Sequence, residues 1–322
     1  MTCLRCQHQT CKRFGYFGKR RIQRWRCTSC RSTFCEPHAK LTRATMTSQP
    51  DLAARAIQCL LEGCSIRSTE RLTGLNRNTI MRLLIIAGRH SERVMDTTMR
   101  DLRPRYLQVD EIWTYVAKKA RKARHEESKE IGDQWVFVGM DAETKLVASF
   151  RIGKRSWETT TGFMEDLYKR MADNHRTQLT TDGFKFYQTA VPDNFGLDVD
   201  FAQLVKLYGD YGQHDAAARY SPSPIIEVIS KVRTGNPDPD HISTSFVERQ
   251  NLTMRMQMRR FTRLTNAFSK KLLHLKAAVA LHFAYYNFCR VHSSLRVTPA
   301  MEAGLTSHIW SVAELLGQQH VI

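Results

Sequence analysis

The chain has 322 residues, and its 49 Lys and Arg outnumber its 31 Asp and Glu, for a net charge of +18. That balance disfavours an ordinary metabolic enzyme and favours a polyanionic partner such as nucleic acid. A content of 42% hydrophobic and 25% charged residues is that of a globular protein and excludes a disordered basic tail or a coiled-coil rod. No apolar run approaches the ~18 residues of a spanning helix, and the first residues lack the apolar stretch of a signal peptide. We therefore expect no membrane partner and a cytoplasmic, nucleoid-associated location.

The charge is unevenly distributed along the chain. Residues 1–100 hold 19 basic and 6 acidic residues, residues 101–248 hold 20 and 23, and residues 249–276 hold eight basic residues and no acid. This pattern suggests that DNA-binding parts flank a part that needs carboxylates. Breaks in the pattern near residues 37–50 and at Arg103-Pro104 separate the first three parts of a predicted multidomain protein, residues 1–38, 50–100 and 104–300, and residues 301–322 are predicted to be a C-terminal helical tail.

The first part carries six of the nine cysteines. Cys3-x2-Cys6 and Cys27-x2-Cys30 form the two-knuckle pattern that places four thiolates around one structural Zn²⁺ ion, as in a zinc ribbon. Six cysteines this close together in a reducing compartment indicate metal binding rather than disulfides.

The segment between the two cysteine pairs is basic and includes Arg21 and Arg24, so we expect it to contact DNA phosphates. A purely structural zinc knuckle is the alternative. A second metal site is a further alternative, formed by the other possible ligands of this segment: Cys11, Cys35, His8 and His38.

The second part predicts a helix-turn-helix. Helices are expected over residues 52–62, with Asp51 as the N-cap, over 66–72, and from about 76 to 89, with Gly74 in the intervening turn. The start of the third helix should read DNA bases with Arg77, Asn78, Thr79 and Arg82. Its buried face should consist of Leu75, Ile80, Leu83 and Leu84. An ordinary packing motif of short helices is the alternative.

The third part begins with a strand whose centre is a carboxylate, Asp110. The alternating pattern predicts strands over residues 105–116, 134–140, 146–152 and 176–181, with a helix over 157–171 between the last two. The first three strands form an antiparallel meander, and the fourth ends directly at Asp182-Gly183. Because a crossover helix joins parallel strands, Asp110 and Asp182 can lie side by side and hold divalent ions.

A third acid, Glu248, follows in Ser245-Phe-Val-Glu248-Arg249-Gln-Asn251. Each acid also has an ordinary explanation: Glu248 in a capping box with Ser245, Asp110 as a hydrogen-bonded strand residue, and Asp182 in a turn. Residues 208–240 are predicted to be an insertion before the helix of Glu248. Glu227 within it is the rival third acid, although its surroundings indicate a strand residue.

Taken together, these motifs resemble the DDE transposases of bacterial and archaeal insertion sequences, and most of all the insertion-sequence-one type. The resemblance covers nearly the whole chain and rests on Val109-Asp-Glu-Ile-Trp113, Thr181-Asp-Gly183 and Phe246-Val-Glu-Arg-Gln-Asn-Leu252. The 65 residues between Asp182 and Glu248 exceed the spacing in compact members of the family, which is why an insertion is predicted between these two acids.

The resemblance implies an RNase H-like mixed-sheet α/β catalytic domain with a basic helical C-terminus, in which Asp110, Asp182 and Glu248 bind two Mg²⁺ or Mn²⁺ ions. It implies cleavage and strand transfer on double-stranded DNA, at terminal inverted repeats and at a target, by a homodimer or larger assembly. Arg249, Asn251 and Arg255 should support the site or contact DNA, and Arg259 and Arg260 should continue the same helix. A DNA-binding regulator with a dead catalytic domain, or a metal-dependent nuclease without strand transfer, is the alternative.

Overall fold

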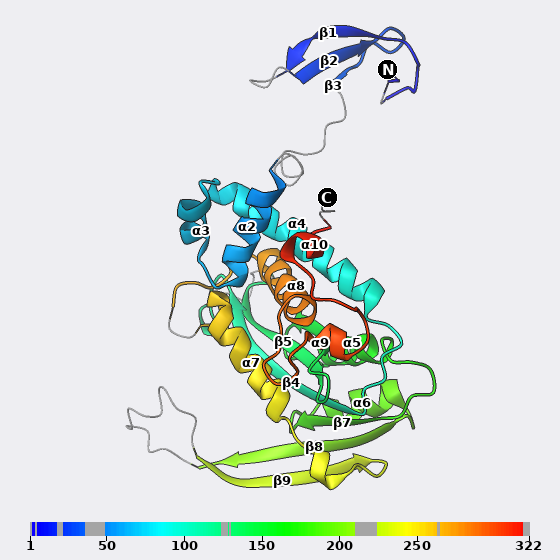
Figure 1. Ribbon diagram of the computed structural model, residues 1–322, viewed down its shortest axis with the longest axis vertical. Coiled ribbons are helices and arrows are strands. Elements are labelled where there is room, and N and C mark those ends of the chain that lie inside the picture. Colours follow the sequence, from blue (N-terminus) through cyan, green and yellow to red (C-terminus); the bar gives the residue numbers. More distant parts are fainter. Residues whose placement is uncertain are drawn as a thin grey trace. The chain divides into compact units, whose positions relative to one another are not determined.

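The protein is described by a computed structural model that covers residues 2–3, 5–17, 22–35, 49–123, 128, 130–209, 224–262 and 265–317. The chain forms two compact units, Met1–Pro50 and Asp51–Ile322, each of which is described by itself (Figure 1). No helix of the described ranges is both long enough and apolar enough to cross a membrane.

The first unit contains a small antiparallel sheet in the order β1-β2-β3. Its strands are β1 (Cys11–Phe17), β2 (Ile22–Cys27) and β3 (Thr33–Cys35). Cys11 lies opposite Cys27, and a bulge interrupts the β1 ladder between Arg13 and Tyr16. Gly15 within the bulge has φ +72°, a conformation that glycine adopts without steric cost.

The second unit begins with three helices: α2 (Pro50–Leu61), α3 (Ile66–Thr73) and α4 (Arg77–Thr98). Asp51 is not the N-cap of α2, because the helix already begins at Pro50, whose fixed φ suits a first helical position. The Gly74 turn after α3 is confirmed, with φ +70°. Asn76 caps α4 by accepting a 2.9 Å hydrogen bond from the backbone N–H of Asn78.

Helix α4 continues nine residues beyond its predicted end because its second half is buried against α8 (Leu272–Phe288). A Cβ atom at Gly88 would lie 2.3 Å from the backbone oxygen of Ala277, so the two helices meet backbone to backbone. Helices α2, α3 and α4 therefore belong to the same compact unit as the large sheet.

The large sheet has six strands in the order β6-β5-β4-β7-β8-β9. Their bounds are β4 (Tyr106–Val116), β5 (Gly132–Asp141), β6 (Val147–Gly153), β7 (Thr177–Asp182), β8 (Val199–Tyr208) and β9 (Ile225–Thr234). The predicted antiparallel meander β4-β5-β6 and the parallel pairing of β4 with β7 are both confirmed. Strand β8 is parallel to β7, and β9 returns antiparallel to β8.

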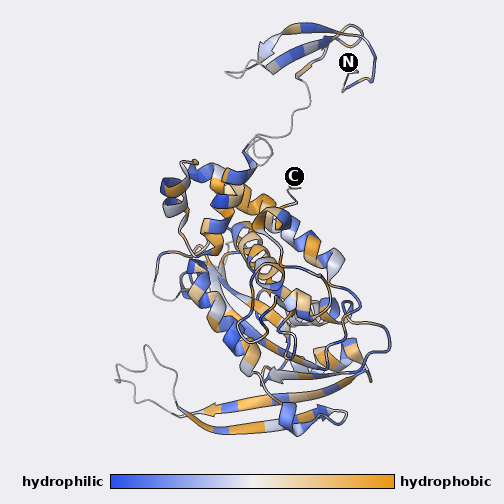
Figure 2. Ribbon diagram, in the orientation of Figure 1, coloured by the Kyte–Doolittle hydropathy of each residue, from blue (hydrophilic) through white to orange (hydrophobic). Residues whose placement is uncertain are grey.

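Helices cover both faces of this sheet (Figure 1). On one face lie α5 (Trp157–Tyr168) and α6 (Tyr187–Phe195), and the ring of Phe163 is 5.8 Å from that of Phe137. On the other face lie α7 (Ser245–Gln257) and α8, where the side-chain oxygen of Gln108 accepts hydrogen bonds from the first turn of α7. Helix α8 is apolar and largely buried, which Figure 2 shows as a mostly orange helix at the centre.

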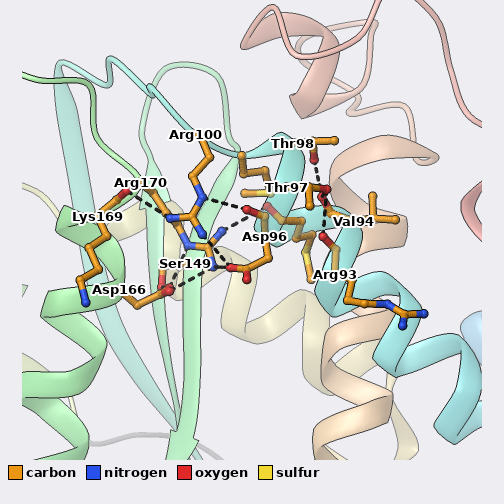
Figure 3. Close-up of polar contacts among 12 residues, drawn as sticks. Arg93, Val94, Asp96, Thr97, Thr98, Arg100, Ser149, Asp166, Lys169 and Arg170 are labelled. Atoms are coloured by element: carbon orange, nitrogen blue, oxygen red, sulfur yellow. Dashed lines mark hydrogen bonds and ion pairs between the residues drawn. The ribbon is translucent and has the colours of Figure 1, made fainter.

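A polar network joins the C-terminal end of α4 to α5 and β6 (Figure 3). The buried guanidinium of Arg170 contacts Asp96 at 2.9 Å and Asp166 at 2.8 Å. Asp166 also accepts a 2.5 Å hydrogen bond from Ser149 on β6, and Arg100 bonds both to Asp96 and to the backbone oxygen of residue 169. The C-terminal end of α4 is thus fixed to α5 and β6 through charged and polar groups.

The segment predicted to be an insertion, residues 208–240, contains the ten-residue strand β9, and residues 210–223 lie outside the described residues. Glu227 lies on β9, as predicted for a strand residue. Helix α7 ends at Gln257 and is followed by a short 3-10 turn, Arg259–Phe261, so Arg259 and Arg260 do not continue the helix. The chain closes with α9 (Pro299–Glu302) and α10 (Val312–Leu315).

Candidate active site and metal centres

Asp110 and Asp182 lie side by side because their strands run parallel in register. Val109 pairs with Thr181, and each carboxylate is the next residue along its strand. Ligand oxygens of Asp110, Glu111 and Asp182 all lie within 4.8 Å of one another. The sequence prediction that these two aspartates meet is therefore correct in position.

Glu248 reaches the same place from the first turn of α7. Together with Asp110 and Asp182 it lines a cavity of about 710 Å³. Its carboxylate accepts a 2.6 Å hydrogen bond from the hydroxyl of Thr244 and pairs with the Lys206 ammonium. The capping-box prediction is wrong, because Thr244 occupies the cap position and Ser245 is already helical. Glu227, on exposed strand β9, does not line this cavity.

Of the three residues expected to support the acids, Asn251 and Arg255 line the cavity and Arg249 does not. Asn251 donates a 2.8 Å hydrogen bond from Nδ2 to Oδ2 of Asp110. Arg255 lines the cavity one turn further along α7 and donates to the backbone oxygen of Phe261 at 3.4 Å. Arg249 is exposed and is not among the cavity-lining residues.

Sequence reasoning assigned no role to Glu111, the neighbour of Asp110, although it is a fourth acid at this site. Its residue is 8% exposed, and Oε2 lies 3.1 Å from the guanidinium of Arg155. The signal that drew attention to Asp110, a carboxylate within an apolar strand, applies equally to Glu111. Strand alternation directs its side chain toward the face covered by α5 and α6.

Arg155 joins two of the acids from the loop between β6 and α5. The same nitrogen that contacts Glu111 lies 3.6 Å from Asp182. The guanidinium also stacks over the ring of Phe184 at 4.0 Å and over Trp135 at 4.8 Å. These aromatic faces hold the positive charge at the edge of the cavity.

The acids repel one another and are poorly hydrated, which favours their protonated forms. Burial and the charge of Asp182 raise the pKa of Asp110 to about 7. The same two causes raise the pKa of Glu111 to about 8, and burial raises the pKa of Asp182. Carboxyl groups with raised pKa values in a cleft mark a candidate functional site. A cation bound there would displace their protons.

The donor set fits hard divalent cations such as Mg²⁺ or Mn²⁺, which prefer carboxylate and amide oxygens. Besides the grouped carboxylates, Oδ1 of Asn251 is buried and accepts no hydrogen bond from the described residues. That oxygen is a further hard donor atom beside Asp110.

The four cysteines of the first unit form a second possible metal centre. Their sulfur atoms all lie within 4.8 Å of one another, with 3.6 Å between Cys3 and Cys30 and between Cys6 and Cys27. Tetrahedral zinc with Zn–S bonds of ~2.3 Å requires sulfurs roughly 3.8 Å apart, so the cluster fits this ion. Hydrogen bonds from Ser32 lower the pKa of Cys30 to about 6, which favours the thiolate that zinc binds.

The possible ligands of a second zinc site are not brought together by the part of the chain described. Cys11 pairs with Cys27 across the ladder but is outside the sulfur cluster. The side chain of Cys35 and all of His38 lie outside the described residues.

The predicted DNA-reading residues of the helix-turn-helix lie at the start of α4. Arg77, Asn78 and Arg82 are exposed, and Thr79 is half-buried. On the opposite face Ile80, Leu83 and Leu84 are buried as predicted, whereas Leu75 is only half-buried. On the first unit, Arg24 donates a 3.0 Å hydrogen bond to Thr33 and lies over the ring of Phe14, and Arg21 lies outside the described residues.

Comparisons with known proteins give structural neighbours only. No protein-family model matches the chain, and no curated protein matches its sequence. A piggyBac transposase synaptic complex with hairpin DNA aligns at 9% identity and TM-score 0.39, over 88% of this chain and 72% of that one. A Mos1 mariner paired-end complex with Mn aligns at 11% identity and TM-score 0.22, over 45% of this chain and 56% of that one. A Mos1 strand transfer complex aligns at 11% identity and TM-score 0.22, over 70% of this chain and 75% of that one. At these values the function has to be argued from the residues of the site.

Proposed function

We propose that this protein is a DDE transposase of a prokaryotic insertion sequence, similar to the insertion-sequence-one type. The observation that carries this proposal is the convergence of Asp110, Asp182 and Glu248, from β4, β7 and α7, on one open cavity. Lys185, Lys206 and Arg255 also line that cavity, so a phosphodiester would meet positive charge on its way to the acids.

In the proposed reaction, water cleaves a phosphodiester at the end of the element, and the freed 3′ hydroxyl then attacks target DNA. Two Mg²⁺ or Mn²⁺ ions, bound between the three acids, would supply activated water and stabilise the departing oxygen. Asn251 orients the carboxylate of Asp110, and Arg155 orients Asp182 and Glu111 while offsetting part of their charge. Both DNA steps use the same residues and need no covalent protein intermediate.

The remaining parts of the proposal concern DNA recognition. Residues 1–38 act as a zinc ribbon, with Arg21 and Arg24 contacting phosphates. Residues 50–100 act as a helix-turn-helix that reads the terminal inverted repeats through Arg77, Asn78, Thr79 and Arg82. Residues 104–300 form the RNase H-like catalytic domain, residues 301–322 its C-terminal tail, and a homodimer or larger assembly acts on double-stranded DNA.

Two alternatives make different predictions. A regulator with an inactive catalytic domain binds DNA but does not cleave it in Mg²⁺ or Mn²⁺. A metal-dependent nuclease cleaves DNA but does not join the freed 3′ end to a second duplex.

The test is an assay of nicking and joining on duplexes that carry the DNA flanking the gene, in Mn²⁺ or Mg²⁺. Asp110→Asn, Asp182→Asn and Glu248→Gln should each abolish both products while DNA binding persists, because loss of one ligand disrupts the whole site. Glu165→Gln, on the exposed surface of α5, is the matched control and should remain active. Activity in all three site variants would contradict the proposal, and binding without any cleavage by the unmodified protein would favour the regulator.

A further inference from the structure

Among the described strands, β9 forms one edge of the large sheet. It is the last strand in the sheet order, and no described strand pairs with its outer side (Figure 1). Two apolar side chains of its regular stretch share one face and are exposed, Val228 at 50% and Val232 at 57%, and Ile226, at the irregularity before that stretch, is 73% exposed. A long edge strand with exposed apolar residues is a template for pairing with another strand, and proteins usually cover or disrupt such edges.

The charged residues of β9 are arranged in a self-complementary way. Glu227 and Lys231 are exposed on the face opposite Val228, two residues on either side of Ile229. Neither forms an ion pair with another described residue. In an antiparallel pair about a two-fold axis at Ile229, Glu227 lies directly opposite Lys231 of the partner subunit, and Lys231 opposite the partner's Glu227.

We propose that β9 pairs with β9 of a second copy of this chain, so that two six-stranded sheets join into one continuous sheet. The pairing creates two Glu227–Lys231 ion pairs and sets Val228 against Ser230 of the partner subunit. The proposal goes beyond the proposed function, since it requires neither DNA nor a metal ion.

The pairing register follows from the strand itself. Irregularities in the β8-β9 ladder leave a regular stretch from Glu227 to Val232, centred near Ile229. A register shifted by one residue per strand would place Glu227 opposite Arg233. The side chain of Arg233 is already engaged, because its Nε donates a 3.0 Å hydrogen bond to Gln203. The Ile229-centred register therefore uses the charges that have no partner within the described chain.

The occupant is a second copy rather than DNA because the strand carries one acidic and two basic residues, for a net charge of only +1, unlike the strongly basic segments elsewhere. A foreign strand could satisfy the backbone edge and the apolar face. Only a copy of β9 in antiparallel orientation supplies Lys231 to Glu227 and Glu227 to Lys231 in one register.

Sedimentation velocity of the full chain, freed of nucleic acid with nuclease, tests the proposal. The unmodified protein should form a dimer. Glu227→Lys and Lys231→Glu should each weaken it by about tenfold or more, because one substitution turns both symmetric ion pairs into repulsions. The double variant Glu227→Lys/Lys231→Glu should recover the dimer. A monomer at every concentration, a dimer indifferent to the single changes, or a double variant without recovery would each overturn the proposal.

Cross-linking checks the register independently. Ile229→Cys places two thiols at the two-fold axis and should give a covalent dimer on oxidation. Ser230→Cys is the matched control, because in this register Ser230 faces Val228 of the partner subunit, and it should cross-link no better than the unmodified chain. Efficient cross-linking through residue 230 but not 229 would overturn the Ile229-centred pairing. Circular dichroism verifies that both variants fold.

Discussion

Asn251 on α7 donates a 2.8 Å hydrogen bond to Oδ2 of Asp110 on β4, across 141 residues of sequence. This bond connects the helix that carries Glu248 to the strand that carries the first acid. It also lowers the pKa of Asp110, against the larger upward effects of burial and of Asp182. Asn251 therefore orients the carboxylate of Asp110 and favours its charged form.

Replacing this amide should affect cleavage through Asp110. In Asn251→Ala we expect the rate of metal-dependent cleavage to fall by about 10 to 100-fold, as for other groups that orient metal ligands. Because the variant lacks a hydrogen bond that favours the carboxylate, the pKa of Asp110 should rise and the pH profile should shift upward. The measurement is the single-turnover rate against pH.

The matched control for Asn251→Ala is Thr253→Ala on the same helix, whose hydroxyl bonds only to the backbone oxygen of residue 249 among the described residues. It should retain both rate and profile. An equal loss at every pH in Asn251→Ala, without a shift of the profile, would show that Asn251 acts only through packing.

The raised pKa values also predict how stability depends on pH. The pKa values of Asp110 and Glu111 are raised in the folded protein from the ordinary 3.8 and 4.5 to about 7 and about 8. Between about pH 4 and pH 8 the folded state therefore holds more protons than the unfolded state, so stability falls as pH rises when no metal is present. Mn²⁺ should reverse this trend, because the ion competes with protons and binds better at higher pH.

Thermal unfolding of the protein from pH 5 to pH 8, with EDTA or with Mn²⁺, measures both effects. The stabilisation by Mn²⁺ should grow with pH over this interval. In the double variant Asp110→Asn/Glu111→Gln the Mn²⁺ effect should disappear, and the fall with pH in EDTA should become shallower. The same stabilisation at pH 5 and pH 8 would count against metal binding by these carboxylates.

The meeting of Asp110 and Asp182 could be predicted because two general rules determine it. Alternating residues identified both strands, and a crossover helix between them required parallel neighbours. The position of Glu248 on a helix could also be predicted. Its contact with Lys206 could not be predicted, because the sequence analysis placed no strand over Val199–Tyr208, the strand β8 that carries Lys206.

Other features depend on tertiary packing that a sequence does not display. Arg155 lies in a loop, and only the folded sheet brings it between Glu111 and Asp182. Helix α4 exceeds its predicted length because Gly88 allows α8 to approach, which is a property of two helices rather than one. Similarly, α7 ends at Gln257 although neither proline nor glycine follows it. The chain turns toward the core at this point, because the side chains of Met258 and Phe261 are buried there.

The polar network around Arg170 predicts a stability effect away from the active site. The Arg170 side chain is 10% exposed and pairs with both Asp96 and Asp166. Removing one partner of a fully buried ion pair leaves the other charge uncompensated, which lowers the free energy of unfolding by about 3 to 5 kcal/mol. Because the two acids are partly hydrated, we expect Arg170→Ala to lower the free energy of unfolding by about 2 to 3 kcal/mol.

Urea denaturation measures this change, and Lys169→Ala is its control. Lys169 forms an exposed pair with Glu165, so its loss should cost only about 0.5 kcal/mol. Equal effects of the two substitutions would mean that the network does not hold α4 to the sheet.

The cysteine cluster predicts one zinc ion per chain. Elemental analysis of the purified protein should find about one Zn²⁺, since four sulfur ligands complete its usual coordination. Cys27→Ser should lose the ion, because one of the four thiolates is missing. The sheet of the first unit is too small to be stable on its own hydrophobic core, so the variant should unfold that unit and bind DNA more weakly.

The second unit should survive the loss of zinc, because none of its described side chains belongs to the sulfur cluster. The thermal transition of the Asp51–Ile322 unit should therefore be unchanged in Cys27→Ser, while amide exchange in β1 and β2 becomes fast. Cys59→Ser on α2 is the control and should retain the zinc. Two tightly held zinc ions in the unmodified protein would support the alternative of a second metal site formed with Cys11 and Cys35. A metal-free protein would contradict the four-cysteine centre.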